Sequence, residues 1–399
     1  LNLFIDAKPI PVLRDMAARA IMTLVTAVNE KHLSQEIAVF EGTLEGVIQV
    51  LQYLRFRPEF SNDAYMISLA TQRVACYMYH IEPSDEKKTS MRTVSSIAKF
   101  NKMFESLLLL LIDLCSHVKD ESSIEEHTKT SEDTSEGYVL INSQKRSPTP
   151  LSVSVDTLSY ISKSEKYRQQ LVQIGVLKVL VPLLQCSIEE KVDESVRLSA
   201  VTTLSYLVEQ PEARNNVVST PSSPQESYMD VYTYGWISAK IVDHDALPSL
   251  IELVSKASSQ NLDAVRHISI LSLNAATKSL ETRTQVRTAA KVLANLASFR
   301  PNRDAMLRAG AVVGIVRGLA SVHSSESLIL EYLMKTLSQI LESSQTNEPY
   351  VQLTSPEILK QLCNLLVSGV RILKILAIDR CNTHSNTKTH RYISMFYVS

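Results

Sequence analysis

A ten-residue apolar frame recurs along this 399-residue chain and limits its fold more than any other feature. The frame is G-x-h-x-x-h-h-x-x-h, where h is apolar, so the apolar positions fall at i, i+3, i+4 and i+7. This spacing belongs to one stripe of an α-helix, whereas a half-buried strand needs strict alternation. Five segments share its apolar positions and three of them begin with Gly; they start at residues 42, 175, 245, 310 and 357: GTLEGVIQVL, GVLKVLVPLL, DALPSLIELV, GAVVGIVRGL and EILKQLCNLL. The chain is therefore predicted to repeat one amphipathic helix.

Two of these segments share their flanking sequence. EKYRQQLVQIG leads to Gly175 and PNRDAMLRAG leads to Gly310, with an arginine seven residues before each glycine. Glycine is favoured at such a helix end because it takes a positive φ without strain. The predicted order is a short helix, a turn, the striped helix and a third helix. Pro182 removes one backbone hydrogen bond inside a striped helix, which predicts a kink without a break.

Each predicted unit has apolar faces that it cannot bury alone. Stacked neighbours would bury these faces, as they do in a solenoid. A low glycine content, 9 residues, agrees with a helical chain, because glycine weakens helices. These observations predict an all-α fold.

Bulk composition excludes several classes of function. The 41 basic and 42 acidic residues nearly cancel, so no global attraction to nucleic acid is expected. The five cysteines are scattered and form no C-x-x-C pair, which favours a reducing compartment, hence a cytoplasmic or nuclear location. No apolar run reaches the roughly 18 residues of a membrane span.

Two stretches carry a family resemblance. NRDAMLRAGAVVGIVRGL (302–319) with AAKVLANLA (289–297) resembles the armadillo-repeat family. YRQQLVQIGVLKVLVPLL (167–184) with RLSAVTTLSYLVE (197–209) is similar, with Ser205 in place of the usual Asn. The resemblance implies a right-handed superhelical, armadillo-like solenoid with disordered insertions, whose third helices line a concave groove.

Four regions are predicted. Residues 1–117 form degenerate armadillo-like helical repeats, and residues 118–154 form an acidic, Ser/Thr-rich disordered loop that has no helical stripe. Residues 155–370 form armadillo-like repeats with an insertion near 219–240, which either plugs the solenoid or docks on its surface. Residues 371–399 form a disordered tail.

Four Ser/Thr-Pro dipeptides lie in or near the predicted insertions. Their first residues are Ser147, Thr149, Thr220 and Ser223. One interpretation is ordinary loop composition. The other is proline-directed phosphorylation, whose added charge would switch the docking of the loop. The sequence leaves both open.

Motifs for catalysis or for bound groups are absent from the sequence. There is no P-loop, G-x-G-x-x-G, G-x-S-x-G or H-E-x-x-H. DHD at 243–245 is interpreted as the cap of a helix over 247–254. Cys381, His384 and His390 lie in the predicted tail and lack a fourth ligand, which disfavours zinc. We expect no enzyme activity, no cofactor, no metal and no small-molecule substrate.

A basic stretch is the most suggestive polar feature. Seven basic residues lie between 283 and 317, and within them Arg287, Lys291 and Asn295 follow at i, i+4 and i+8 on one helix face. The resemblance implies that Asn295 holds the backbone of an extended peptide. Arg287, Lys291 and Arg303 would then favour acidic or phosphorylated partner segments. The alternative is a solvated basic face.

The predicted function is a non-catalytic protein–protein interaction scaffold that binds a protein segment along an armadillo-type groove. One alternative is the targeting or regulatory arm of a larger enzyme whose catalytic domain is absent from this chain. Another is a nucleic-acid-binding solenoid, which the near-neutral charge disfavours. The groove tryptophans that mark nuclear-import adaptors in the family are missing, since the chain has one Trp.

Overall fold

A computed structural model describes most of the central part of the chain. The described residues are 11–27, 41–55, 64–81, 94–117, 149–184, 193–209, 224–256, 273–322 and 326–343, with 356 and 360. Within them every regular element is a helix, which confirms the all-α prediction. The predicted tail, the segment at 357–366 apart from residue 360, and Ser147, Thr220 and Ser223 lie outside the described residues.

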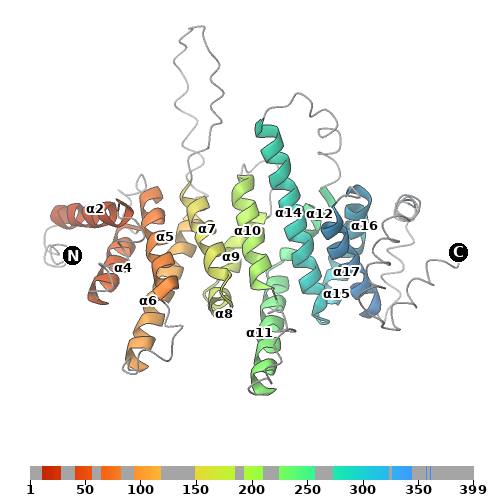
Figure 1. The fold of residues 1–399 in the computed structure, drawn as a ribbon, viewed down its shortest axis with the longest axis horizontal. Coiled ribbons are helices and arrows are strands. Elements are labelled where there is room, and N and C mark those ends of the chain that lie inside the picture. Colours follow the sequence, from red (N-terminus) through yellow and green to blue (C-terminus); the bar gives the residue numbers. More distant parts are fainter. Residues whose placement is uncertain are drawn as a thin grey trace, which may run out of the picture.

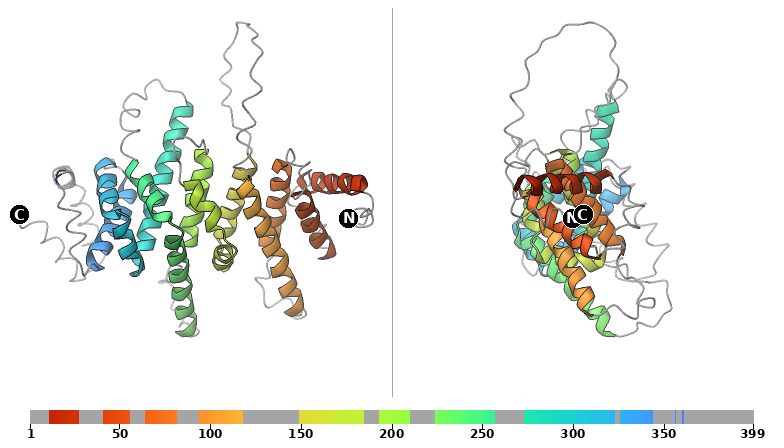
Figure 2. Two further views of the ribbon diagram at one scale, coloured as in Figure 1. Left: turned by 180° about the vertical axis from the view of Figure 1, so that it is seen from behind. Right: turned by 90° about the vertical axis from the view of Figure 1, so that its left-hand side faces the viewer.

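The helices follow one another along the long axis of the molecule (Figure 1). In chain order they are α2 (Pro11–Ala27), α4 (Glu41–Arg55), α5 (Ala64–Ile81), α6 (Val94–His117), α7 (Pro150–Ser162), α8 (Glu165–Gln173), α9 (Leu177–Leu184), α10 (Glu194–Leu207), α11 (Pro224–Asp243), α12 (Ala246–Lys256), α14 (Leu273–Ser298), α15 (Asn302–Arg308), α16 (Ala311–Ser321) and α17 (Ser327–Ser343). The view from behind shows the same progression (Figure 2, left).

Helix contacts sort the elements into three rows. The third-helix row contains α2, α5, α7, α10, α14 and α17, each packed against the next. The second-helix row contains α4, α6, α9, α12 and α16, again each against the next. The first-helix row contains α8, α11 and α15. A helix therefore contacts mainly its counterparts in neighbouring units and its own unit.

The last three units each contain one member of every row. They are α8–α9–α10, α11–α12–α14 and α15–α16–α17. In the first and last of these units this is the predicted order of short helix, turn, striped helix and third helix, whereas the first helix of the middle unit, α11, has 20 residues. Among the described residues, the N-terminal part shows only the second and third rows, in the pairs α4–α5 and α6–α7.

The first position of the frame is a turn residue with positive φ in these three units. Gly175 has φ 95°, Gly310 has φ 77° and Asp245 has φ 58°. Asp is one of the few non-glycine residues that tolerate this conformation. Asp245 does precede α12, as the capping interpretation requires, but its left-handed φ makes it the counterpart of the two glycines. Gly42, in contrast, lies inside α4 and marks no turn.

The apolar positions of the frame form the core. In the four copies at 42, 175, 245 and 310, every h position is buried. The structure also shows a sixth copy, KMFESLLLLL at 102–111 in α6, whose four h positions are at most 1% exposed. The sequence analysis did not identify it, because the continuous run of leucines at 107–111 hides the helical spacing of the h positions. It divides the long interval between the copies at 42 and 175.

Two predicted insertions end differently from expectation. The loop expected over 118–154 ends before α7, which begins at Pro150 and is capped by Thr149 through a 3.1 Å hydrogen bond from the Ser152 amide. The insertion near 219–240 contains α11, whose Tyr234, Ile237 and Ile241 are buried. Their i, i+3, i+7 spacing is helical, so this stretch is the first helix of a unit.

The helix α9 continues through Pro182, so the proline does not break it. Whether the helix kinks there stays a prediction. No helix in the described ranges is both long enough and apolar enough to cross a membrane.

Candidate partner-binding site

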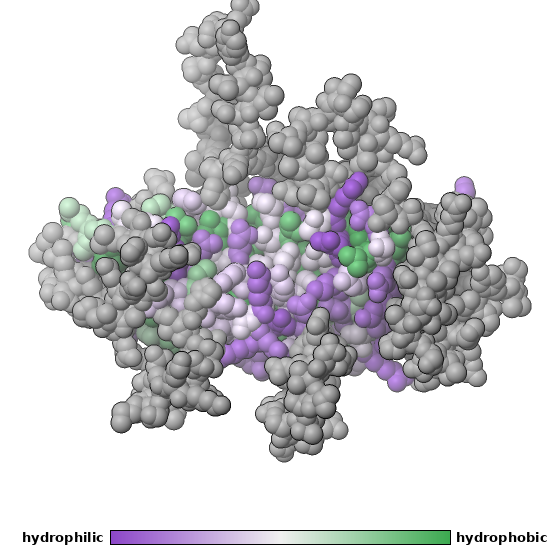
Figure 3. All heavy atoms as spheres, in the orientation of Figure 1, coloured by the Kyte–Doolittle hydropathy of each residue, from purple (hydrophilic) through white to green (hydrophobic). Residues whose placement is uncertain are grey.

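The exposed face of the third-helix row contains the residues that the sequence predicted for partner binding. On α14 one apolar stripe is buried, formed by Val286, Ala289, Ala290, Leu293, Leu296 and Ala297. Arg287 is exposed, while Lys291 and Asn295 are half-buried on the other face. Figure 3 shows hydrophilic side chains gathered over the middle of the molecule, with apolar patches between them.

Helices α10 and α14 present the same burial pattern at their C-terminal ends. The run Leu204, Ser205, Tyr206, Leu207 matches Leu293, Ala294, Asn295, Leu296, because only the third residue of each run is half-buried. Tyr206 therefore occupies the place of Asn295. The sequence alignment assigned Ser205 to it, and the structure corrects this, since Ser205 is buried.

Two cations of α14 are paired with carboxylates from neighbouring third helices. Lys291 Nζ lies 2.6 Å from Glu209 Oε1 at the end of α10, and Arg283 Nη1 lies 3.7 Å from Glu326 Oε1 at the start of α17. Arg287, one turn from each, makes no side-chain hydrogen bond or ion pair with another described residue. Within the described part of the chain, a positive charge without an ion-pair partner therefore lies between two paired ones.

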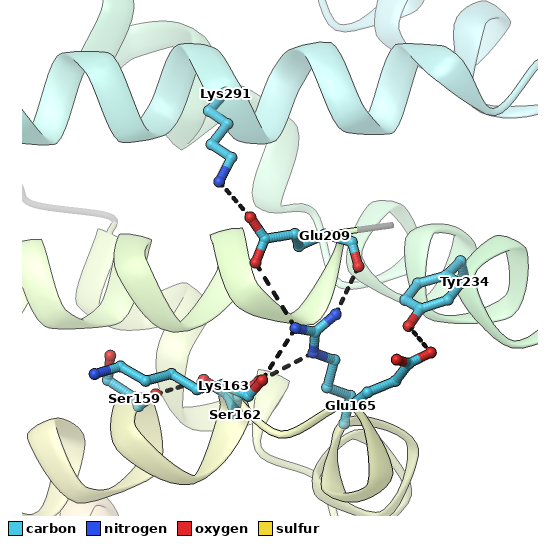
Figure 4. A network of polar contacts seen from close by, with 8 residues as sticks. Ser159, Ser162, Lys163, Glu165, Glu209, Tyr234 and Lys291 are labelled. Carbon is cyan, nitrogen blue, oxygen red and sulfur yellow. Dashed lines mark hydrogen bonds and ion pairs between the residues drawn. The ribbon is translucent and has the colours of Figure 1, made fainter. Parts of the chain in front are cut away.

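Glu209 belongs to a polar network that joins four helices (Figure 4). Its backbone carbonyl accepts a 2.6 Å hydrogen bond from Arg168 Nη1, while its Oε2 lies 3.7 Å from Arg168 Nη2. Arg168 Nε and Nη2 also donate to the carbonyls of Ser162, at 3.0 Å, and Lys163, at 3.3 Å. Arg168 thus satisfies carbonyls at the C-terminal ends of α7 and α10, which have no partner inside their helices.

Arg303 occupies the position of Arg168 in the last unit. It is half-buried, and its Nε donates a 2.7 Å hydrogen bond to the carbonyl of Ala297 near the end of α14. The sequence predicted Arg303 as a partner-binding residue. Its described contact is instead internal, so we leave it out of the candidate site and assign it a structural role.

Aromatic side chains extend the surface toward the N-terminus. The rings of Tyr79 and Tyr160 have centroids 5.1 Å apart. Lys163 Nζ lies 5.1 Å from the ring centre of Tyr160 and 5.8 Å from that of Tyr206. These are distances of aromatic and cation–π contacts. Half-buried tyrosines from α5, α7 and α10 thus precede the basic face of α14, a pattern that the sequence analysis did not identify.

Other polar features suggest no chemistry. A cleft of about 520 Å³ between α8 and α11 contains Glu165 and Tyr234, whose hydroxyl donates to that carboxylate. Burial raises the pKa of Cys115 to about 12, which keeps this thiol protonated at neutral pH. Among the described residues, no cluster of three or more His, Cys, Asp or Glu is placed to hold a metal. Cys381, His384 and His390 lie outside them.

Comparison with known proteins adds little. No protein-family model matches the chain, and no curated protein matches it in sequence. The chain is similar to the crystal structure of an engineered protein, with 15% identity and a TM-score of 0.43 over 86% of this chain and 96% of that one. A similarity at this level supports no argument about fold or function.

Proposed function

We propose that this protein is a non-catalytic, armadillo-like scaffold, built as a right-handed solenoid, that binds an acidic segment of a protein partner along its third-helix row. The carrying observation is the basic face of α14, where Arg287 is exposed and has no ion-pair partner among the described residues, beside Lys291 and Asn295.

The helix rows support the solenoid. Contacts between neighbouring units repeat in the same order along the chain: each helix of the second and third rows packs against the next member of its row, and α8, α11 and α15 do the same in the first row. Such stacking produces extended binding surfaces in repeat proteins. The positive-φ turn residue and the buried frame recur with it.

The chemistry of the surface supports an acidic partner. Both cations that flank Arg287 already hold carboxylates in this chain. A carboxylate or phosphate from a partner would find at Arg287 the same kind of contact, with two donors available for a bidentate pair. The tyrosines of α7 and α10 offer apolar faces for neighbouring side chains of the same segment.

Direct binding of defined peptides tests the proposal. A short fluorescein-labelled peptide of alternating Glu and Ser should raise its anisotropy with this protein more than a Gln–Ser peptide does. The double variant Arg287→Glu and Lys291→Glu should weaken binding by about tenfold or more. The control variant Arg308→Glu changes an exposed arginine on α15 and should alter peptide binding little.

Two outcomes would count against this function. Equal binding of the acidic and neutral peptides, or unchanged binding by the double variant, would remove the basic face as the site. Tighter, salt-dependent binding of a single-stranded oligonucleotide at the same face would favour the nucleic-acid alternative.

A further inference from the structure

We propose that Glu209 is an internal occupant of the partner site, and that an acidic segment binds by replacing the Glu209 carboxylate on Lys291. This inference rests on the proposed function and adds a regulatory contact to it. The carboxylate comes from the end of α10 and reaches across to α14, so it holds the position that a partner anion would take (Figure 4).

The geometry allows the side chain to leave while the backbone stays. Glu209 follows Val208, the C-cap of α10, and its carbonyl is held by Arg168 Nη1. Rotation of the Glu209 side chain therefore breaks no helix hydrogen bond. Among the described residues, Glu209 is the one partner of Lys291 Nζ, so release of the carboxylate leaves the ammonium available to another anion.

The remaining contacts of Glu209 are weak enough for exchange. Its second oxygen lies 3.7 Å from Arg168 Nη2, beyond hydrogen-bond range, while the donors of Arg168 are used by three backbone carbonyls. The side chains of Glu209 and Lys291 are 35% and 32% exposed. Ion pairs of such exposure contribute little net stability, because water screens them.

An incoming anion gains a contact that Glu209 lacks. Arg287 lies one helical turn from Lys291, and residues so spaced have side chains about 5–6 Å apart at their Cβ atoms. A partner carboxylate or phosphate on Lys291 has a second cation beside it, whereas Glu209 is paired with Lys291 and not with Arg287. In the exchange, the ion pair between Glu209 and Lys291 is replaced by a partner anion that contacts both Lys291 and Arg287.

The affinity of Glu209→Gln for the Glu–Ser peptide tests the exchange. This variant keeps the backbone carbonyl that Arg168 needs, and far-ultraviolet circular dichroism checks its fold. We expect affinity about two- to fivefold higher than that of the wild type, because no ion pair must be broken first. A peptide with phosphothreonine in place of Glu distinguishes a phosphorylated partner from a carboxylate one.

Two controls separate the contact from overall charge. Asp243→Asn removes an equally negative, exposed group that pairs with Lys240 on α11, and should leave the affinity unchanged. In a Lys291→Gln background, Glu209→Gln should also have no effect. Equal gains from Asp243→Asn and Glu209→Gln, or a full gain without Lys291, would overturn the exchange.

The outcomes for the two proposals differ. If the wild type binds through Arg287 and Lys291 but Glu209→Gln binds no better, the exchange is wrong and the proposed function stands. If neither the wild type nor Glu209→Gln prefers the acidic peptide, both are wrong.

Discussion

Gly318 of α16 lies against Val254 of α12 with no room for a methyl group between them. A Cβ atom at position 318 would lie 2.6 Å from Val254 Cγ1 and 3.3 Å from the Val254 carbonyl oxygen. The backbone of α16 at Gly318 therefore packs directly against the Val254 side chain of α12, the neighbouring helix in the second-helix row. The close approach depends on a glycine inside a helix, where glycine is otherwise unfavourable.

Gly318→Ala is expected to destabilise the protein. Overpacking typically costs about 1–3 kcal/mol, which exceeds the roughly 1 kcal/mol that alanine gains over glycine in a helix. Urea unfolding should show a lower midpoint. The double variant with Val254→Ala should lose less than the two single changes add up to, because the second change makes room for the first. Strict additivity would contradict the contact.

Substitutions at the turn residues of two units are expected to change stability in opposite directions. Gly310→Ala places a side chain at φ 77° with no neighbour within 4 Å, so the cost is purely conformational, about 1–2 kcal/mol. Asp245→Gly relieves the same strain at φ 58° and should be neutral or stabilising by up to about 1 kcal/mol. Thermal unfolding compares the two. A stabilising Gly310→Ala would show that the turn is not as described.

Arg168 and Lys291 contact the same glutamate but should differ in their effect on stability. Arg168→Met leaves three buried or half-buried carbonyls without donors, and we expect a loss of about 2–4 kcal/mol in the free energy of unfolding. Lys291→Met removes one half-buried ion pair that water still reaches, and should cost less than about 1 kcal/mol. Denaturant titrations of both variants check this order, and a reversed order would contradict it.

The raised pKa of Asp156 predicts a small pH dependence of the free energy of unfolding. Burial raises the pKa of its carboxyl, and the hydrogen bond from Ser199 partly offsets this rise. The folded state then binds more protons than the unfolded chain, so stability falls as pH rises through the raised pKa. Asp156→Asn should gain stability over the wild type at pH 7, and the gain should shrink below the unfolded pKa of about 4. The residue keeps solvent access, so the effect is modest. A gain that grows on acidification would contradict the sign.

The local features were predictable from the sequence because they depend on a few adjacent residues. The h positions of four frame copies and the stripe of α14 are buried as the 3.6-residue period requires. The turns at Gly175 and Gly310 follow from glycine's tolerance of positive φ. The copy in α6 was missed because a continuous run of leucines hides its helical spacing, and α11 was missed because its aromatic residues were interpreted as part of an insertion.

The candidate site was only half visible in the sequence. Arg287, Lys291 and Asn295 share a face because four-residue spacing places them there on any helix. The carboxylate that pairs with Lys291 could not be predicted, because Glu209 lies 82 residues from Lys291 in the chain. The structural role of Arg303 could not be predicted either. An arginine before a turn looks the same in the sequence whether it donates to a helix end or binds a partner.

By itself, then, the sequence determined that the chain is helical, which residues form the buried stripes and where two of the turns fall. Helical periodicity and backbone sterics act over fewer than ten residues and need no knowledge of neighbours. The tertiary structure decided which helices lie side by side. That packing pairs Lys291 with Glu209, places Arg168 against the Glu209 carbonyl and leaves Arg287 without an ion-pair partner among the described residues. Such contacts depend on stacking between units, because a charge is compensated only by what lies within a few ångströms of it.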